Sequence, residues 1–361
     1  MPKSEIRRKA EVIFLRKITD IRVYSRDSRA IAFGTIISSS LLGLFFLASV
    51  LCSQAAENAD TMQRAFNPNA KTNEIVAAQF DILLDFDETV HRQVEDWARV
   101  AKTNELSGDV VQVAILKTRI QQRLDQLDRA YAKFISEHPD HVRARLALAS
   151  YLREWDRDAE ALEQLEKSKS LEPTNPTVWN NLGNYYGHTG TSSNAFSCYL
   201  KAIELSPKEP LYYQNLARNL YLFQEDAAVF LKTNLPAALI KAQDYYRQAL
   251  SLSPTNFVIA TDLAQTFYAV RVALTNSPEV NHRVVDGLVG QAMEAWKQAE
   301  KLAGSKTQLE GVWIHMARIQ MNAKRWDEAR LILRRVTLPE YEDTRKAMLE
   351  KIQHAQTGKP K

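Results

Sequence analysis

The stretch WNNLGNYYGHTGTSSNAFSCYLKAIELSP, residues 179–207, decides the fold of this chain. Its bulky apolar and small residues recur three or four apart in two runs, a spacing typical of one face of a helix. The small residues stand where two helices must approach closely, and the final proline stops the second helix because it lacks a backbone N–H. The residues of this pattern are Trp179, Leu182, Gly183, Tyr186, Ala195, Tyr199, Ala202 and Pro207. The stretch therefore predicts one complete pair of packed helices.

The unit recurs along the chain. Pro139, Pro173 and Pro207 are separated by 34 residues each. With this period and this pattern, the chain resembles the tetratricopeptide-repeat (TPR) family, whose repeat is a helix–turn–helix of that length. The resemblance implies an α-solenoid of antiparallel helix pairs that acts as an interaction scaffold for a protein or peptide partner.

We expect about five repeats. The unit before Pro173 is divergent, with Arg145 at the position of Trp179. Two later units are longer, because 47 residues separate Pro207 from Pro254 and 50 separate Pro254 from Gly304. We expect the first insertion between the two helices of its unit. Five stacked pairs exceed the roughly three that a continuous core requires.

Helical segments flank the repeats. Residues 73–141 carry two apolar stripes at helical spacing, which predict a helical cap or a degenerate repeat. The repeat array then occupies residues 142–343. A capping helix and tail follow at 344–361, with Ala347, Met348 and Ile352 facing inward. Glycine is scarce and useful period-two alternation is absent, so the predicted fold class is all-α.

Residues 31–52 predict a transmembrane signal anchor. These 22 residues carry no charge and are long enough, as a helix, to cross a hydrocarbon layer about 30 Å thick. The preceding residues 1–30 have a net charge of +5, whereas the linker 53–72 sums to zero. The positive-inside rule then predicts a single-pass protein of the inner (plasma) membrane, with a cytoplasmic amino end and extracytoplasmic repeats, periplasmic in a bacterium.

A cleaved secretory signal is the alternative, since Ser53-Gln54-Ala55 resembles a cleavage site. Both interpretations place the repeats outside the cytoplasm. The chain's net charge of +4 leaves residues 31–361 at −1 once the basic amino end is removed. This balance argues against a nucleic-acid partner.

The sequence contains no motif for catalysis, a cofactor or a metal. Nucleophile elbows, His-Glu-x-x-His pairs and glycine-rich dinucleotide turns are all missing, so we predict that the chain is not an enzyme. Asp87 and His91 stand four apart on one helix face. We expect them, with Asp85 and Glu88, to form a solvated helix face.

A ligand would bind where first helices of successive repeats line a concave surface. Asparagine offers a donor and an acceptor, so a row of such side chains can pair with the backbone of an extended peptide. The groove residues predicted in this way are Asn181, Asn184, Asn215, Arg218, Asp262 and Gln265. A solvated polar face is the other interpretation. The family's carboxylate clamp is excluded, because Asn180, Val258 and Asp262 stand where that class has cations.

Two further surfaces stay open. The segment between Leu222 and Ala238 either folds back on its own repeat or presents a hydrophobic knob to a partner. Ser39 and Gly43 permit close contact between membrane helices, so self-association is possible. The function predicted from the whole pattern is a membrane-anchored scaffold. The alternative is a non-catalytic accessory or substrate-holding subunit of an envelope enzyme complex, or a secreted repeat protein after signal cleavage.

Overall fold

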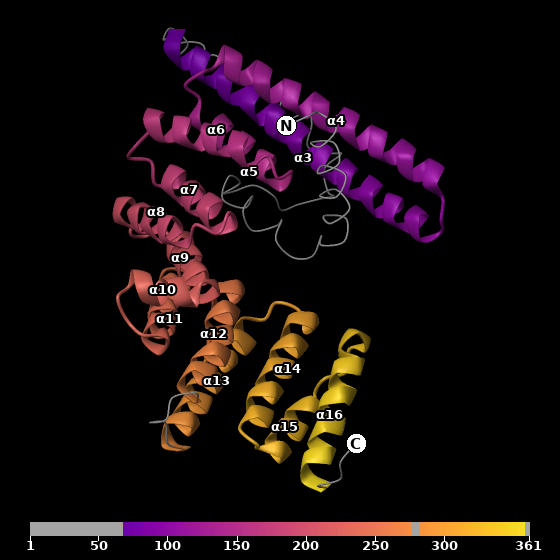
Figure 1. Cartoon of the computed structure of the whole chain (residues 1–361), viewed down its shortest axis with the longest axis vertical. Helices are drawn as coiled ribbons and strands as arrows, with labels where there is room; N and C mark the ends of the chain where they lie inside the picture. The colour runs from indigo at the N-terminus through magenta and orange to yellow at the C-terminus, as the bar shows by residue number, and fades with distance from the viewer. Residues whose placement is uncertain (1–67, 276–281, 358–361) are drawn as a thin grey trace, which may run out of the picture. The chain divides into compact units, whose positions relative to one another are not determined.

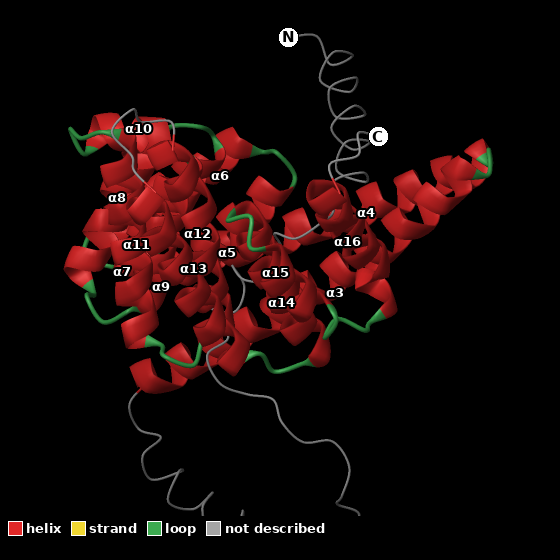
Figure 2. Cartoon of the chain, turned by 90° about the horizontal axis from the view of Figure 1, so that it is seen from below, coloured by secondary structure: helices red, strands yellow, loops and turns green. Residues whose placement is uncertain are grey.

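The computed structural model describes residues 68–275 and 282–357, and this part of the chain consists of helices and connecting loops without a strand (Figures 1 and 2). The predicted all-α class is confirmed there. The expected span at 31–52, the segment 1–30 and most of the linker 53–72 lie outside the described residues. Among the helices that are described, none is both long and apolar enough to cross a membrane.

The chain divides into two compact units, residues 1–148 and 149–361, with the division inside α5 (Val142–Glu154). The first unit contains a hairpin of α3 (Pro68–Leu106) and α4 (Val110–Glu137). Gly108 in the turn has φ +80°, a conformation that glycine adopts without a Cβ clash. The apolar stripes seen in the sequence fill the hairpin core, with Phe80, Leu83, Val90, Val94, Leu116, Ile120, Leu124, Leu127, Tyr131 and Phe134 all buried.

The second unit is a succession of helix pairs, each helix packed against the next. Its helices after α5 are α6 (Asp158–Leu171), α7 (Pro176–His188), α8 (Ser192–Leu205), α9 (Pro210–Leu222), α10 (Gln224–Phe230), α11 (Leu235–Leu252), α12 (Phe257–Thr275), α13 (His282–Leu302), α14 (Lys306–Asn322), α15 (Trp326–Leu333) and α16 (Glu342–Thr357), with a 3-10 turn η1 at Pro339–Tyr341. The pairs are α7 with α8, α9 with α11, α12 with α13 and α14 with α15. We call α7, α9, α12 and α14 the first helices.

Close helix approach within the pair α7–α8 depends on Gly183. A β-carbon there would lie 2.6 Å from Cε1 of Tyr199, closer than van der Waals contact permits. Ala195 and Ala202 on α8 are fully buried. The packing predicted from the sequence is therefore confirmed for this repeat.

Junctions between pairs begin the next first helix in a common way. The prolines Pro173, Pro207 and Pro254 mark these junctions. The side chain of the second residue after each of them accepts a hydrogen bond from a backbone amide of the helix that follows. Asn175 caps α7, Glu209 caps α9 and Asn256 caps α12. Such caps satisfy amides that the start of a helix leaves without partners, so each repeat has a defined first residue.

The two insertions take different forms. The first forms α10 between α9 and α11, and this short helix packs back on α8 through Phe230 and Phe196, whose ring centroids lie 5.2 Å apart. Ser192 also donates a hydrogen bond to Asp226 at 2.5 Å. Val229 remains 79% exposed. The second longer unit instead has long helices, 19 residues in α12 and 21 in α13.

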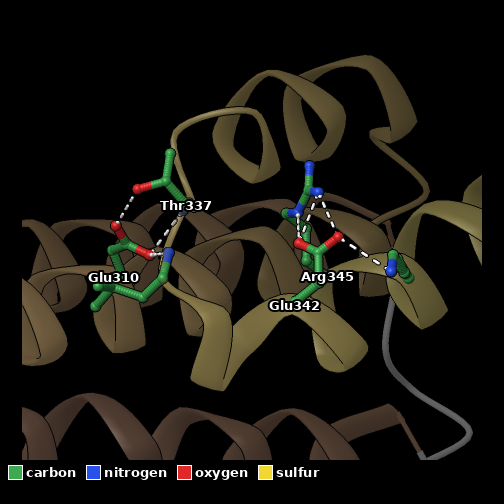
Figure 3. A network of polar contacts seen from close by, with 6 residues as sticks. Glu310, Thr337, Glu342 and Arg345 are labelled. Atoms are coloured by element: carbon green, nitrogen blue, oxygen red, sulfur yellow. Dashed lines mark hydrogen bonds and ion pairs between the residues drawn. The ribbon is translucent and has the colours of Figure 1, made fainter.

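The carboxyl end is closed by α16, which packs on α14 and α15. Met348 and Ile352 face inward as expected. Ala347 is exposed, so the prediction was wrong at that residue. Met348 and Ile352 are four residues apart and share the buried face of the helix, and Ala347 therefore lies outside that face. The segment before α16 is held by the buried carboxylate of Glu310, which accepts hydrogen bonds from the amides of Thr337 and Leu338 and from the Thr337 hydroxyl (Figure 3).

Candidate peptide-binding face

The first helices of the second unit form one continuous row. Helix α9 contacts both α7 and α12, and the Tyr268 hydroxyl of α12 donates a hydrogen bond to the backbone carbonyl of His315 on α14. One position of the repeat lies two residues after the landmark Leu182, Leu216, Leu263 or Met316. It holds Asn184, Arg218, Gln265 and Arg318, all polar and all at least partly exposed. We call these four residues, together with Asn181, the first-helix face.

Asn181 and Asn184 both lie on α7 and are partly buried. The amide nitrogen of Asn181 donates to the carbonyl oxygen of Thr177 in the same helix, at 2.9 Å. The side-chain oxygen of Asn184 accepts a hydrogen bond from the Tyr199 hydroxyl, also at 2.9 Å. Each asparagine therefore has one half of its amide engaged within the repeat.

Tyr199 links this position to the next repeat. Its hydroxyl also accepts a hydrogen bond from Asn219 on α9, at 3.2 Å. Burial raises the pKa of Tyr199, so the hydroxyl stays protonated and can donate to Asn184. The buried Tyr199 hydroxyl thus fixes the orientation of the Asn184 side chain.

Asn215 and Asp262 tie neighbouring first helices together. Asn215 donates to the side-chain oxygen of Asn180, at 2.9 Å, and Gln214 donates to Asp262, at 3.0 Å. The two bonds repeat each other one unit apart, because each joins the residue two before the landmark leucine of one repeat to the residue one before the landmark leucine of the next. Part of the predicted groove set is therefore used between repeats. From the sequence, Asn180 entered only the argument against a carboxylate clamp and Gln214 was not considered; both are polar residues buried at a helix contact.

Arg218 forms an ion pair with Asp262, with an N–O distance of 2.8 Å. Their side chains are 28% and 19% exposed, so the pair is shielded from water on most sides. Burial lowers the pKa of Arg218, but the adjacent carboxylate outweighs this effect and raises the pKa overall. The two charges neutralise each other in the middle of the row.

Gln265 and Arg318 are the most open members of the first-helix face, since both are exposed. The sequence reasoning missed Arg318 because it followed the first helices only as far as α12. The same offset from the landmark Met316 identifies it. Beside it, His315 stacks on Trp296 with ring centroids 4.5 Å apart and planes 7° from parallel. Burial, and then the charge of Arg318, lowers the pKa of His315 to about 4.

Asp87 and His91 in the first unit do not form the solvated face that the sequence suggested. His91 is 7% exposed, and Asp87 accepts a hydrogen bond from the Tyr131 hydroxyl of α4, at 2.6 Å. The His91 ring also contacts the Asp87 carboxylate. The expectation was wrong for these two residues because α4 covers this side of α3. Asp87 and His91 form a polar contact inside the hairpin, and Asp87 links α3 to α4 through Tyr131.

The described residues show no grouping of three or more His, Cys, Asp or Glu side chains suited to a metal ion. The polar groups of the first-helix face are amides, which donate and accept hydrogen bonds, and guanidinium groups, which only donate them. This chemistry suits recognition of a polar backbone and its side chains.

The family model for the tetratricopeptide repeat matches residues 176–209. No protein of curated function matches the chain in sequence. Among solved structures, YrrB, "a TPR protein with an unusual peptide-binding site", is similar at 15% identity and a TM-score of 0.41, over 63% of this chain and 98% of its own. PilW, a "widely conserved type IV pilus biogenesis factor", is similar at 17% identity and a TM-score of 0.43, over 64% and 93%. PilF of Pseudomonas aeruginosa is similar at 16% identity and a TM-score of 0.41, over 72% and 99%.

The matched residues 176–209 contain α7 and α8, the pair with the close Gly183–Tyr199 contact. The other pairs of the second unit repeat its junction caps and its buried small residues. The chain therefore carries a tetratricopeptide repeat at residues 176–209, within an all-α array of packed helix pairs.

Proposed function

We propose that this protein is a membrane-tethered adaptor that holds an extended segment of a partner protein on the first-helix face. The observation that carries this proposal is the recurrence of polar, solvent-accessible side chains at one position of four successive first helices. Asn184, Arg218, Gln265 and Arg318 stand in a row, with buried contacts beneath that fix the helices.

The geometry of the row suits an extended chain. Packed helices lie roughly 8–10 Å apart, and an extended peptide advances roughly 3.3 Å per residue. Each first helix therefore meets about every third residue of a peptide that crosses the row. Amides and guanidinium groups at that interval bind the peptide backbone and selected side chains. Micromolar docking corresponds to about −8 kcal/mol, which a few such contacts with modest apolar burial supply.

The membrane tether rests on the sequence. Residues 31–52 are uncharged, and the net charge of +5 in residues 1–30 favours a cytoplasmic amino end. The repeats then lie on the extracytoplasmic side of the inner membrane. An alkaline phosphatase fusion at the carboxyl end is expected to be active, and a fluorescent protein that fails to mature outside the cytoplasm is expected to be dark. The opposite pair of results would overturn this placement.

The binding face is tested by placing a photo-crosslinking amino acid at Gln265 in the full chain, in cells. A matched position is Gln248 on α11, which is also an exposed glutamine but lies on a second helix. We expect a defined partner to crosslink at 265 and not at 248. Partners captured equally at both positions, or only at 248, would contradict the proposed face.

A blocking variant provides the second arm. Gln265→Trp places a bulky ring on the face without touching a buried contact, whereas Gln248→Trp makes the same change elsewhere. We expect the first variant alone to lose the partner in a detergent pull-down. Unchanged recovery with Gln265→Trp would show that the partner binds another surface.

A further inference from the structure

The acidic groups of the first helices are all engaged within the protein. Helices α7, α9, α12 and α14 contain two acidic residues, Asp262 and Glu310. Asp262 is paired with Arg218 and accepts a hydrogen bond from Gln214. Glu310 is fully buried and holds the Thr337–Leu338 segment. No carboxylate on these four helices is therefore available to neutralise a cationic ligand.

Arg318 is in the opposite situation. Its side chain is exposed on α14, and among the described residues it has no carboxylate partner within ion-pair distance. It lies one helical turn after His315, whose ring and carbonyl are contacted by the Tyr268 hydroxyl at 3.2 Å. Arg318 also opposes the rise that burial causes in the pKa of Tyr268. The guanidinium therefore lies where α12 and α14 meet.

We propose that Arg318 binds the carboxylate of an Asp or Glu side chain within the extended segment on the first-helix face, and so selects acidic partners. This inference rests on the proposed function. A guanidinium presents paired donors that match both oxygens of a carboxylate, and such charge-assisted bonds are stronger than neutral ones. Gln265, on the neighbouring first helix, supplies an amide for the peptide backbone beside that side chain.

Charge complementarity favours a peptide over a polyanion. Arg218, the other arginine of the face, is already paired with Asp262, so the row offers one unmatched cation and not a basic patch. Residues 31–361 carry a net charge of −1, since residues 1–30 contribute +5 to the chain's +4. A nucleic acid or an anionic membrane surface needs several cations at close spacing. One carboxylate among mostly neutral residues matches one guanidinium.

The test is selection from a display library of random twelve-residue peptides, flanked on both sides by fixed neutral linkers, against the full chain in mild detergent. We expect selected peptides to be enriched in Asp or Glu at one position. Arg318→Gln should weaken a selected peptide about tenfold, and replacing the peptide's acidic residue by Gln or Asn should weaken binding to the wild type equally. The two changes together should cost no more than either alone.

The matched control is Arg334→Gln, which removes an exposed arginine at the end of α15, a second helix. It is expected to leave affinity within twofold of the wild type. Arg318→Glu should in turn prefer the same peptide with Lys at the acidic position, and this gain of binding does not depend on loss of fold.

The outcomes separate the two proposals. Peptides that bind, are lost with Gln265→Trp, and show neither acidic enrichment nor sensitivity to Arg318→Gln would overturn the role of Arg318 and leave the face intact. Failure of the wild type to select any peptide would overturn both proposals.

Discussion

The guanidinium of Arg145 donates two hydrogen bonds to the carbonyl oxygen of Pro139, from Nε at 3.0 Å and from Nη2 at 2.6 Å. One repeat later, the indole N–H of Trp179 donates to Pro173, and the Tyr213 hydroxyl then donates to Pro207. In each case the donor lies six residues after the proline. These prolines lie two residues beyond the end of the preceding helix, so no N–H of that helix reaches their carbonyl groups, and at these three junctions a long side chain from the next helix supplies the donor.

This relationship explains the divergent repeat. Arg145 departs from the aromatic residue that the family pattern favours, yet it is 8% exposed and makes the same bond. The position six residues after the proline requires a side chain that is long enough to reach the proline carbonyl and that carries a hydrogen-bond donor. Arginine, tryptophan and tyrosine all have both.

Removing that donor should weaken the first junction. Arg145→Met keeps the aliphatic stem but leaves the Pro139 carbonyl without these bonds, and we expect a loss of about 1.5–3 kcal/mol in the free energy of unfolding. Urea denaturation followed by circular dichroism measures it. Arg129→Met, an exposed position on α4, is the control and should stay within about 0.5 kcal/mol of the wild type. Equal stability of the two variants would contradict the role given to Arg145.

Gly183→Ala should destabilise the matched repeat. Alanine usually stabilises a helix relative to glycine by about 1 kcal/mol, but here its β-carbon meets the Tyr199 ring at 2.6 Å. We expect a net loss of about 1–3 kcal/mol, the usual cost of overpacking.

Gly290→Ala on α13 is the opposite case, because nothing lies within 4 Å of its new β-carbon. It should raise the melting temperature slightly while Gly183→Ala lowers it. If both variants raised the melting temperature, helix propensity and not the Tyr199 contact would govern position 183.

Glu310→Gln should loosen the carboxyl-terminal cap. Both amides donate to Oε2, so the one side-chain oxygen of glutamine can still accept from them, but those bonds lose the carboxylate charge and the Thr337 hydroxyl loses its acceptor at Oε1; we expect a loss of about 1–2 kcal/mol. Burial raises the pKa of Glu310, but these hydrogen bonds outweigh it and leave the pKa below its usual value of 4.5.

The sign of the pH effect follows from that direction. The stabilisation from Glu310 is present above pH 4.5 and is lost as the pH falls through the lower folded pKa. The difference in stability between wild type and Glu310→Gln should therefore shrink in acid. A difference that does not change with pH would mean that the carboxylate charge is not what holds the Thr337 segment.

His315 should make the repeats sensitive to mild acid. Its pKa is about 4 in the folded chain and 6.5 without burial, so the unfolded chain binds the proton more readily. Stability is complete above about pH 6.5 and falls as the pH drops toward 4. By pH 5 the loss from this group is about 2 kcal/mol.

The comparison variant for this effect is His315→Phe, which keeps a ring against Trp296. The drop in melting temperature between pH 7 and pH 5 should be smaller in this variant than in the wild type. An equal drop in both would assign the acid sensitivity to other groups.

Much of the fold could be predicted because its determinants are local or periodic. The spacing of Trp179, Leu182 and Gly183 specifies a helix face, and the prolines set the repeat length. The roles of polar residues could not be predicted in the same way. The Asn215 side chain could point to a ligand or bond to Asn180 on the neighbouring helix. The rotation of α9 against α7 decides between the two, and no local sequence pattern encodes that rotation.

The sequence by itself determined that this chain forms stacked helix pairs, because burial of an apolar stripe at helical spacing requires a neighbour with the same stripe. Only the tertiary structure decided which polar groups are engaged between repeats and which are presented to solvent. It paired Arg218 with Asp262 and left Arg318 exposed, since hydrogen bonds and ion pairs depend on distances of a few ångströms between residues far apart in the chain.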